Sequence, residues 1–255
     1  MTRIITLCML LLGADAAFAQ GELAAATLFS PRRIIKTNLA GYAFLSINAN
    51  FEQKTGGNTS VGLLGGYKLP SVVKVEAIGE LDGERQTYTG DIEPQGVFLN
   101  PYFRFYTSET FHGFYLEAFV RWFNYNYKVP YEYEKNGENI SAALDGTASA
   151  IGGGLSLGGQ FRLGPRVYLD VYGGYGMAVG NAHVETNDPR LELEDYRAIK
   201  RNIERYQDDA DVQVFILGDI LKDPVANATD TKAWADFNDK LFPVLRGGVC
   251  IGFAF

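Results

Sequence analysis

The last eleven residues of the chain, Leu245 to Phe255, alternate between two kinds of side chain. Apart from Gly247, one face is apolar and consists of Leu245, Val249, Ile251, Phe253 and Phe255. The other face is small or polar and consists of Arg246, Gly248, Cys250, Gly252 and Ala254. This pattern predicts a β-strand, and its length matches the ~9–11 residues that a tilted strand needs to cross a membrane. An edge strand of a soluble barrel would alternate in the same way, so both alternatives stay open at this point.

The same alternation recurs along the chain and predicts eight strands. The candidate strands are 34–39, 45–52, 60–69, 97–105, 114–123, 151–163, 167–179 and 245–255. The predicted connections alternate in length: those after Glu52, Thr107 and Leu163 are short, whereas 70–96, 129–146 and 181–244 are long. Short periplasmic turns and long outer loops are typical of outer-membrane barrels. We therefore expect an all-β fold, an eight-stranded antiparallel up-and-down transmembrane β-barrel.

The N-terminus predicts export. Arg3, the apolar stretch from Ile4 to Gly13 and the small residues of Ala17-Phe18-Ala19 match a secretory signal peptide, cleaved after Ala19. We expect a signal peptide at 1–19 and a barrel over 20–255. Cleavage leaves Cys250 as the only cysteine, which rules out an internal disulfide and a thiolate metal cluster. The net charge of −7 makes nucleic acid an improbable partner.

Three motifs resemble a known family. They are the opening Lys36-Thr37-Asn38-Leu39-Ala40, the glycine-rich hairpin from Gly152 to Gly176 and the final stretch from Gly248 to Phe255. Over about Arg33 to Phe255 the chain resembles an uncharacterised family of small outer-membrane barrels from Bacteroidetes with a KTNLL-type opening. The terminal Phe255 also resembles the last residue of bacterial outer-membrane barrels, where it is part of the assembly signal. The resemblance implies a fold and a location in the outer membrane, and it carries no catalytic residue.

The charged residues of the predicted strands lie opposite their apolar faces and therefore point into the barrel. They are Lys36, Glu52, Lys68, Arg104, Glu117, Arg121, Arg162, Asp170 and Arg246. Buried charges must be paired, so we expect a network in which each acidic residue forms ion pairs with one or two arginines. An eight-stranded barrel is filled by its own side chains, which favours a plugged interior over a narrow ion path.

The predicted insertion 181–244 has eight basic and fourteen acidic residues, a net charge of −6. Leu193, Tyr196 and Ile199 recur at helical spacing, and a second helix is expected through Ala233, Trp234 and Phe237. Several apolar segments within one loop predict a packed, partly helical extracellular cap.

No pattern indicates catalysis, a cofactor or a metal site. The two histidines, His112 and His183, lie at opposite ends of the predicted barrel. We therefore expect a structural anchor or an adhesin-like surface-binding protein, not an enzyme. Its expected partners are outer-membrane lipid and lipopolysaccharide, the barrel assembly machinery and an extracellular molecule that the sequence does not identify. The alternatives are a narrow ion or solute channel and a soluble exported barrel that binds an apolar ligand.

Overall fold

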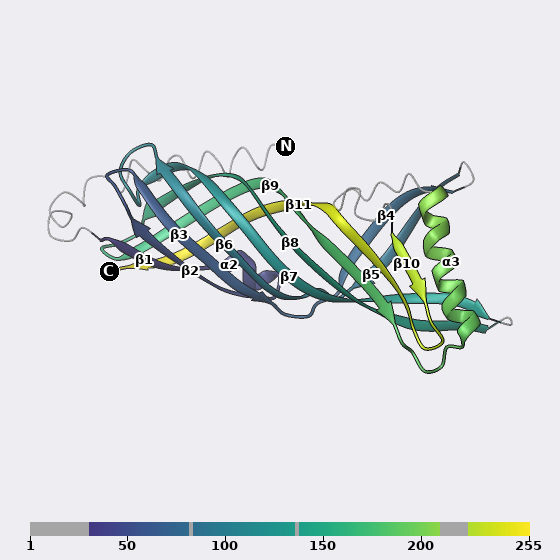
Figure 1. Cartoon of the computed structure of the whole chain (residues 1–255). Helices are drawn as coiled ribbons and strands as arrows, with labels where there is room; N and C mark the ends of the chain where they lie inside the picture. The colour runs from purple at the N-terminus through teal and green to yellow at the C-terminus, as the bar shows by residue number, and fades with distance from the viewer. Residues whose placement is uncertain (1–30, 82–83, 136–137, 210–223) are drawn as a thin grey trace.

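A computed structural model describes residues 31–81, 84–135, 138–209 and 224–255. The fold is a closed ring of eight antiparallel strands in the order β1-β2-β3-β6-β7-β8-β9-β11 (Figure 1). The ring strands are β1 (Arg33–Asn38), β2 (Ser46–Lys54), β3 (Thr59–Lys68), β6 (Gln95–Tyr106), β7 (Gly113–Lys135), β8 (Glu138–Arg162), β9 (Val167–Thr186) and β11 (Ala233–Ala254). Pairing of β1 with β11 closes the ring. The predicted eight-stranded, all-β antiparallel barrel is confirmed.

Side-chain burial in the ring is the reverse of that in a water-soluble barrel. The apolar face of each strand points outward, with Ile35 53%, Phe103 47% and Leu155 58% exposed. The opposite face is buried, and Glu52 and Arg104 there are fully inaccessible. Since a soluble protein normally buries its large apolar side chains, this reversal is the feature that most constrains where such a ring is stable.

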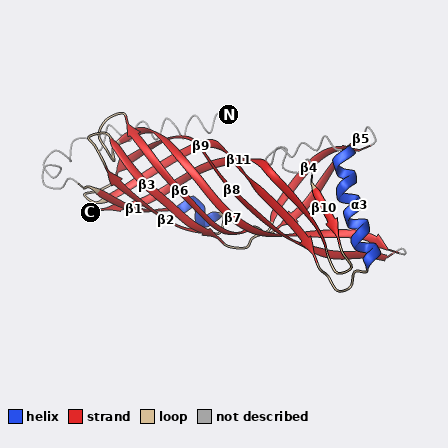
Figure 2. Cartoon of the chain, viewed as in Figure 1, coloured by secondary structure: helices blue, strands red, loops and turns tan. Residues whose placement is uncertain are grey.

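The two ends of the barrel differ. Tight turns join β2 to β3, β6 to β7 and β8 to β9 at the end where the C-terminus lies (Figure 1). At the other end, β7, β8, β9 and β11 continue well beyond the rest of the ring (Figure 2). Two short elements complete this end: β10 (Val225–Ala228) pairs with the start of β11, and α3 (Leu193–Asp209) packs beside them.

Two of the connections predicted as long loops are instead β-structure. Within 70–96, β4 (Val73–Leu81) and β5 (Glu84–Ile92) form a separate two-stranded hairpin. The 129–146 connection consists of the extended ends of β7 and β8, which pair as far as Lys135 and Glu138. The polar composition of 70–96 and 129–146 therefore belongs to strands that extend outside the closed ring, and not to irregular loops.

The predicted insertion 181–244 is partly strand. The expected helix through Leu193, Tyr196 and Ile199 is confirmed as α3, but the second helix is wrong: Ala233, Trp234 and Phe237 lie in β11. A bulge between Phe237 and Lys240 shifts the register against β9, and Asp239 has φ +56° there. Because the bulge breaks the period-two pattern of side chains, the sequence pattern did not predict this part of the strand. Residues 210–223 of this insertion and the predicted signal peptide lie outside the described residues.

No helix among the described residues is long and apolar enough to cross a membrane. The short helix α2 (Leu39–Ala43) lies between β1 and β2, in the connection between the predicted strands 34–39 and 45–52.

Candidate functional site

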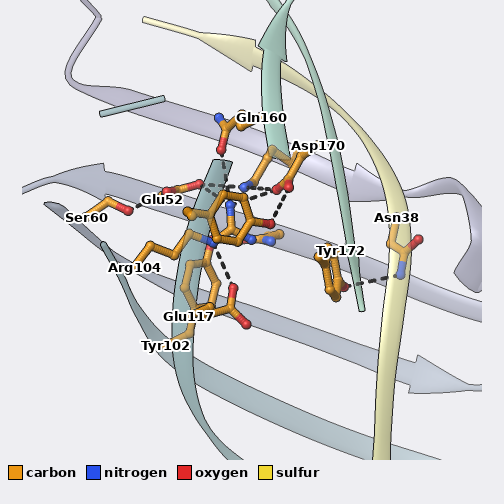
Figure 3. A network of polar contacts seen from close by, with 12 residues as sticks. Asn38, Glu52, Ser60, Tyr102, Arg104, Glu117, Gln160, Asp170 and Tyr172 are labelled. Atoms are coloured by element: carbon orange, nitrogen blue, oxygen red, sulfur yellow. Dashed lines mark hydrogen bonds and ion pairs between the residues drawn. The ribbon is translucent and has the colours of Figure 1, made fainter. Parts of the chain in front are cut away.

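A network of charged side chains lies inside the barrel (Figure 3), on the parts of the strands that are next to the short turns. Lys36 on β1 donates to Glu52 on β2 and to Asp170 on β9, each at 2.5 Å. Arg104 on β6 donates to Glu117 on β7 at 2.7 Å and to Asp170 at 2.8 Å, and its Nη1 lies 3.2 Å from Glu52. All of these side chains are fully buried. Five strands of the ring are therefore joined through one set of ion pairs.

Neutral groups satisfy the remaining acceptors of the network. Ser60 and Tyr106 both donate to Glu52, at 2.5 and 2.6 Å, and Tyr115 donates to Asp170 at 2.6 Å. The Gln160 oxygen accepts from Arg104 at 3.1 Å and lies 2.8 Å from the Tyr106 hydroxyl, whose single hydrogen is shared between Glu52 and Gln160. Buried ion pairs persist only when the remaining lone pairs are also hydrogen-bonded, and this network meets that condition for both Glu52 and Asp170.

Aromatic rings enclose the guanidinium of Arg104. Its Cζ lies 4.6 Å from the centre of the Tyr102 ring and 4.0 Å from that of Tyr115. Glycines on the inner face make room for these rings, because a Cβ at Gly62 would collide with Tyr102 and one at Gly158 would collide with Tyr115. The small face that the sequence showed is thus matched to large side chains from neighbouring strands.

The structure brings six of the nine predicted interior charges together: Lys36, Glu52, Arg104, Glu117, Asp170 and Arg246. Arg246 on β11 pairs with Glu117. The other three lie apart. Lys68 donates to the carbonyl of Leu69 at the end of β3, and Arg162 donates to the hydroxyl of Tyr168 at 3.1 Å. Arg121 donates to the hydroxyl of Tyr125 at 2.9 Å and lies over the Phe98 ring.

The proposed assembly residue Phe255 lies just after β11 with its side chain 45% exposed. Its backbone exchanges two hydrogen bonds with Arg33, so the last residue continues the ladder to β1.

Sequence reasoning did not identify Ser60, Tyr102, Tyr106 and Gln160 as members of the network. Their only signal is that they occupy inward positions of the same alternation as the charges. It also did not identify Asn38 and Asn48, which hold the wall of the ring together at a second place.

The wall of the ring is interrupted where β1 ends. Beyond Asn38, no described strand lies between β2 and β11, and α2 occupies the space. Asn48 takes over the pairing of β1: its Oδ1 accepts from the Asn38 amide at 2.7 Å and its Nδ2 donates to the Asn38 carbonyl at 3.1 Å. The side chain of Asn38 does the same for β11, since it donates to the Gly247 carbonyl and accepts from the Val249 amide, both at 3.2 Å. Side-chain amides thus satisfy backbone groups that a continuous strand would have paired.

A cavity of about 100 Å³ lies behind this interruption. Polar and cationic side chains contribute much of its lining, which includes Gly41, Asn100, Arg121, Leu245, Arg246 and Gly247. The Asn100 side chain is fully buried, and neither its oxygen nor its nitrogen has a hydrogen-bond partner among the described residues. The Nε and Nη2 groups of Arg246 likewise have no partner in the described part of the chain.

No group of three or more His, Cys, Asp or Glu residues suited to a metal occurs within the described ranges. His183 contacts Asp236 through Nδ1 at 2.7 Å and lies 3.6 Å from Glu185, partly exposed on the extended ends of β9 and β11. Cys250 is a buried free thiol.

These features define a class: a small all-β barrel with an apolar outer face and a charged, filled interior. The chain belongs to a family described as proteins of unknown function, DUF3575, whose model matches residues 5–185. The match includes the first seven strands of the ring almost to the end of β9 and stops before α3, β10 and β11. No curated protein and no solved structure matched the chain. The expectation of an uncharacterised family is therefore confirmed.

Proposed function

We propose that the chain is an outer-membrane β-barrel, of the kind in Bacteroidetes that its opening motif resembles, and that it anchors a folded platform at the cell surface. The platform consists of α3, β10 and the ends of β9 and β11 (residues 182–186 and 233–237). In this proposal the barrel holds the platform in place, and the platform binds an extracellular partner. Outer-membrane lipid and lipopolysaccharide would surround the barrel, and the assembly machinery would recognise Phe255.

The observation that carries this proposal is the reversed polarity of the ring. A band of exposed aliphatic and aromatic side chains surrounds a core in which Lys36, Glu52 and Arg104 are buried. In water this arrangement would expose apolar surface all around the barrel, whereas in a bilayer the same surface contacts hydrocarbon. The distribution of short turns and extended strands supports the orientation, with the C-terminus in the periplasm.

The platform has a core of its own, as expected of a rigid binding surface. Leu191, Tyr196, Ile199 and Ala233 form a buried cluster that joins α3 to the start of β11. The hydroxyl of Tyr196 donates to the carbonyl of Asp188 at 2.8 Å and fixes the entry to the helix. The opposite side of α3 presents exposed Glu194, Arg197 and other charges to solvent.

The two alternatives receive less support. The charge network and its aromatic neighbours fill the cross-section of the barrel, which argues against a channel. Single-channel recordings that show steady conductance would support the channel instead. An exported soluble barrel for an apolar ligand would need apolar side chains inside, whereas the interior positions around Glu52 and Asp170 are polar.

Limited trypsin digestion of intact cells tests the proposal. We expect peptides from between Arg190 and Arg205 to be released while the ring strands stay intact, because α3 is at the outer surface. Release only after the cells are broken would place the platform inside the cell envelope and contradict the proposal. A periplasmic protein that trypsin cleaves readily serves as the control for cell integrity.

If the native protein resists trypsin, a variant with a loosened platform still tests the orientation. Ile199 is buried against the platform, so Ile199→Asp should loosen α3 and expose its arginines. Cleavage of this variant on intact cells would still place α3 outside. Cleavage of the variant in broken cells alone would overturn the proposed orientation.

A further inference from the structure

The cavity beside α2 carries a surplus of positive charge. The central network is balanced, since Lys36, Arg104 and Arg246 face Glu52, Glu117 and Asp170. Arg121 lies on the cavity wall in addition to these, and no carboxylate within the described residues pairs with it. A partly buried cation without a counter-charge is costly, and an anion in the cavity would relieve that cost.

Two residues that line the same cavity, Asn100 and Arg246, carry unused hydrogen-bond groups. The Nε and Nη2 groups of Arg246 and the side-chain amide of Asn100 have no partner in the described part of the chain, and both residues are at least nine-tenths buried. Buried polar groups of this kind are rare in folded proteins and indicate a missing ligand or solvent. Together with Arg121 they form an arrangement of N–H donors that suits an oxyanion such as a phosphate or carboxylate.

Residues of the outer face of the barrel also line the cavity. Its lining includes Gly41 of α2 and the outward-facing Leu245 and Gly247 of β11, and Leu245 is 69% exposed. A route from the cavity to the outer face passes through the interruption of the wall between β2 and β11, where the Asn38 and Asn48 side chains replace strand pairing. At about 100 Å³, the cavity is well below the roughly 300 Å³ of small-molecule pockets, so it accommodates a head group but not a hydrocarbon chain.

We propose that this cavity binds the anionic head group of a single-chain amphiphile, whose hydrocarbon chain leaves the barrel between β2 and β11 beside Leu245. Arg121, Arg246 and Asn100 bind the head group. The apolar surface outside the interruption, with Leu39 and Leu245, contacts the chain. The surroundings of the chain rest on the membrane location proposed above, whereas binding itself is measured on purified protein and does not depend on where the protein resides in the cell.

Calorimetric titration of the full chain in a neutral maltoside detergent tests this inference. The probes are octyl phosphate, inorganic phosphate and octanol. We expect octyl phosphate to bind at one site per chain and at least about tenfold more tightly than either of the others, because only octyl phosphate offers both the charge and the chain. Equal affinity for inorganic phosphate would indicate a small-anion site and overturn the proposal, as would the absence of saturable binding.

Two pairs of variants separate the site from general effects. Arg121→Gln should weaken octyl phosphate about tenfold, because it removes a charged hydrogen-bond donor. Arg162→Gln is the matched control, since Arg162 also bonds a tyrosine hydroxyl and lies near an aromatic ring but is not in the cavity lining. Equal losses in the two variants would contradict the assignment.

The second pair tests the route of the chain. A side chain at Gly247 has room to extend from the outer face at the interruption, so Gly247→Phe should weaken octyl phosphate and leave any weak binding of inorganic phosphate unchanged. Gly173 on β9 is the pairing partner of Gly247, has similar open space around it and does not line the cavity. Gly173→Phe is therefore the control. If Gly247→Phe binds octyl phosphate as tightly as Gly173→Phe does, the chain does not leave by this route.

Discussion

Arg104 on β6 and Asp170 on β9 meet inside the barrel, with Nη1 of the arginine 2.8 Å from Oδ2 of the aspartate. Two strands, β7 and β8, separate them around the ring. The same arginine nitrogen also lies near Glu52, and the same aspartate oxygen also accepts from Lys36. This contact is therefore the centre at which both sides of the ring are joined.

Removing Arg104 should be severely destabilising. Arg104→Gln would leave Glu52, Glu117 and Asp170 with fewer cations in a fully buried site, so we expect the free energy of unfolding to fall by about 3–5 kcal/mol. Urea unfolding in detergent micelles measures the change. Arg162→Gln, on a partly exposed arginine, should cost less than about 1 kcal/mol, and similar losses for both variants would contradict a central role for Arg104.

The interruption of the wall should depend on Asn38. Asn38→Ala removes the bonds to the Gly247 carbonyl and the Val249 amide. We expect a loss of about 1–3 kcal/mol in unfolding free energy, since these backbone groups would lose their partners, together with faster hydrogen exchange at the Val249 amide. Asn124→Ala, at an exposed position, is the control. Unchanged protection at Val249 would show that the side chain does not close the wall.

A charge on the outer face should harm folding in a bilayer. Leu155 is 58% exposed on the ring, so Leu155→Arg should reduce stability in lipid vesicles by up to about 4 kcal/mol if that face contacts hydrocarbon. Val225 is exposed to a similar extent, 55%, but lies on β10 in the platform, and Val225→Arg should have little effect. Equal tolerance of both changes in vesicles would argue against a lipid-facing ring.

Asp188 should titrate at unusually low pH. Hydrogen bonds from the side chain and backbone amide of Arg190 hold the pKa of the Asp188 carboxyl at about 2, against about 3.9 for a free aspartate. Because the folded pKa is the lower one, the ionised group stabilises the platform above about pH 3.9, and this contribution is lost as the pH falls through 2.

The chemical shift of the backbone amide of residue 190 during an NMR titration reports this event. We expect a midpoint near pH 2 in the native chain and a higher midpoint in Arg190→Ala, which lacks the side-chain donors. A midpoint near the ordinary aspartate value in the native chain would contradict the role of Arg190.

The ring was predictable because its signal is local. In a strand, successive side chains point to opposite faces, so alternation alone separates Ile35 from Lys36 and Phe103 from Arg104. Short turns such as Gly164-Pro165 then set the order of neighbouring strands. Both features are contained in stretches of about ten residues, and the structure agrees with them.

The composition of the site was less predictable because contacts across a barrel depend on strand tilt and stagger. Alternation places Lys36, Arg121 and Arg162 on the same inner face, but only Lys36 lies at the height of Glu52 and Asp170. The role of Asn38 depends on where β1 ends relative to β11, and no local sequence pattern predicts this position. The bulge after Phe237 likewise depends on the register against β9.

The closing ladder between β1 and β11 has a consequence for the lifetime of the folded state. It contains five residue pairs and the β1–β2 ladder contains four, whereas β11 and β9 share nineteen, so the two ladders of β1 are the places where the ring has least backbone pairing. Lys36, on the β1 side, is ion-paired with Asp170, which lies beyond β11. Opening the seam must therefore separate buried opposite charges before water can reach them, and this raises the activation barrier. One of the two short ladders of the ring is thereby made slow to open, and the closing seam of the barrel is protected kinetically although its backbone pairing is limited.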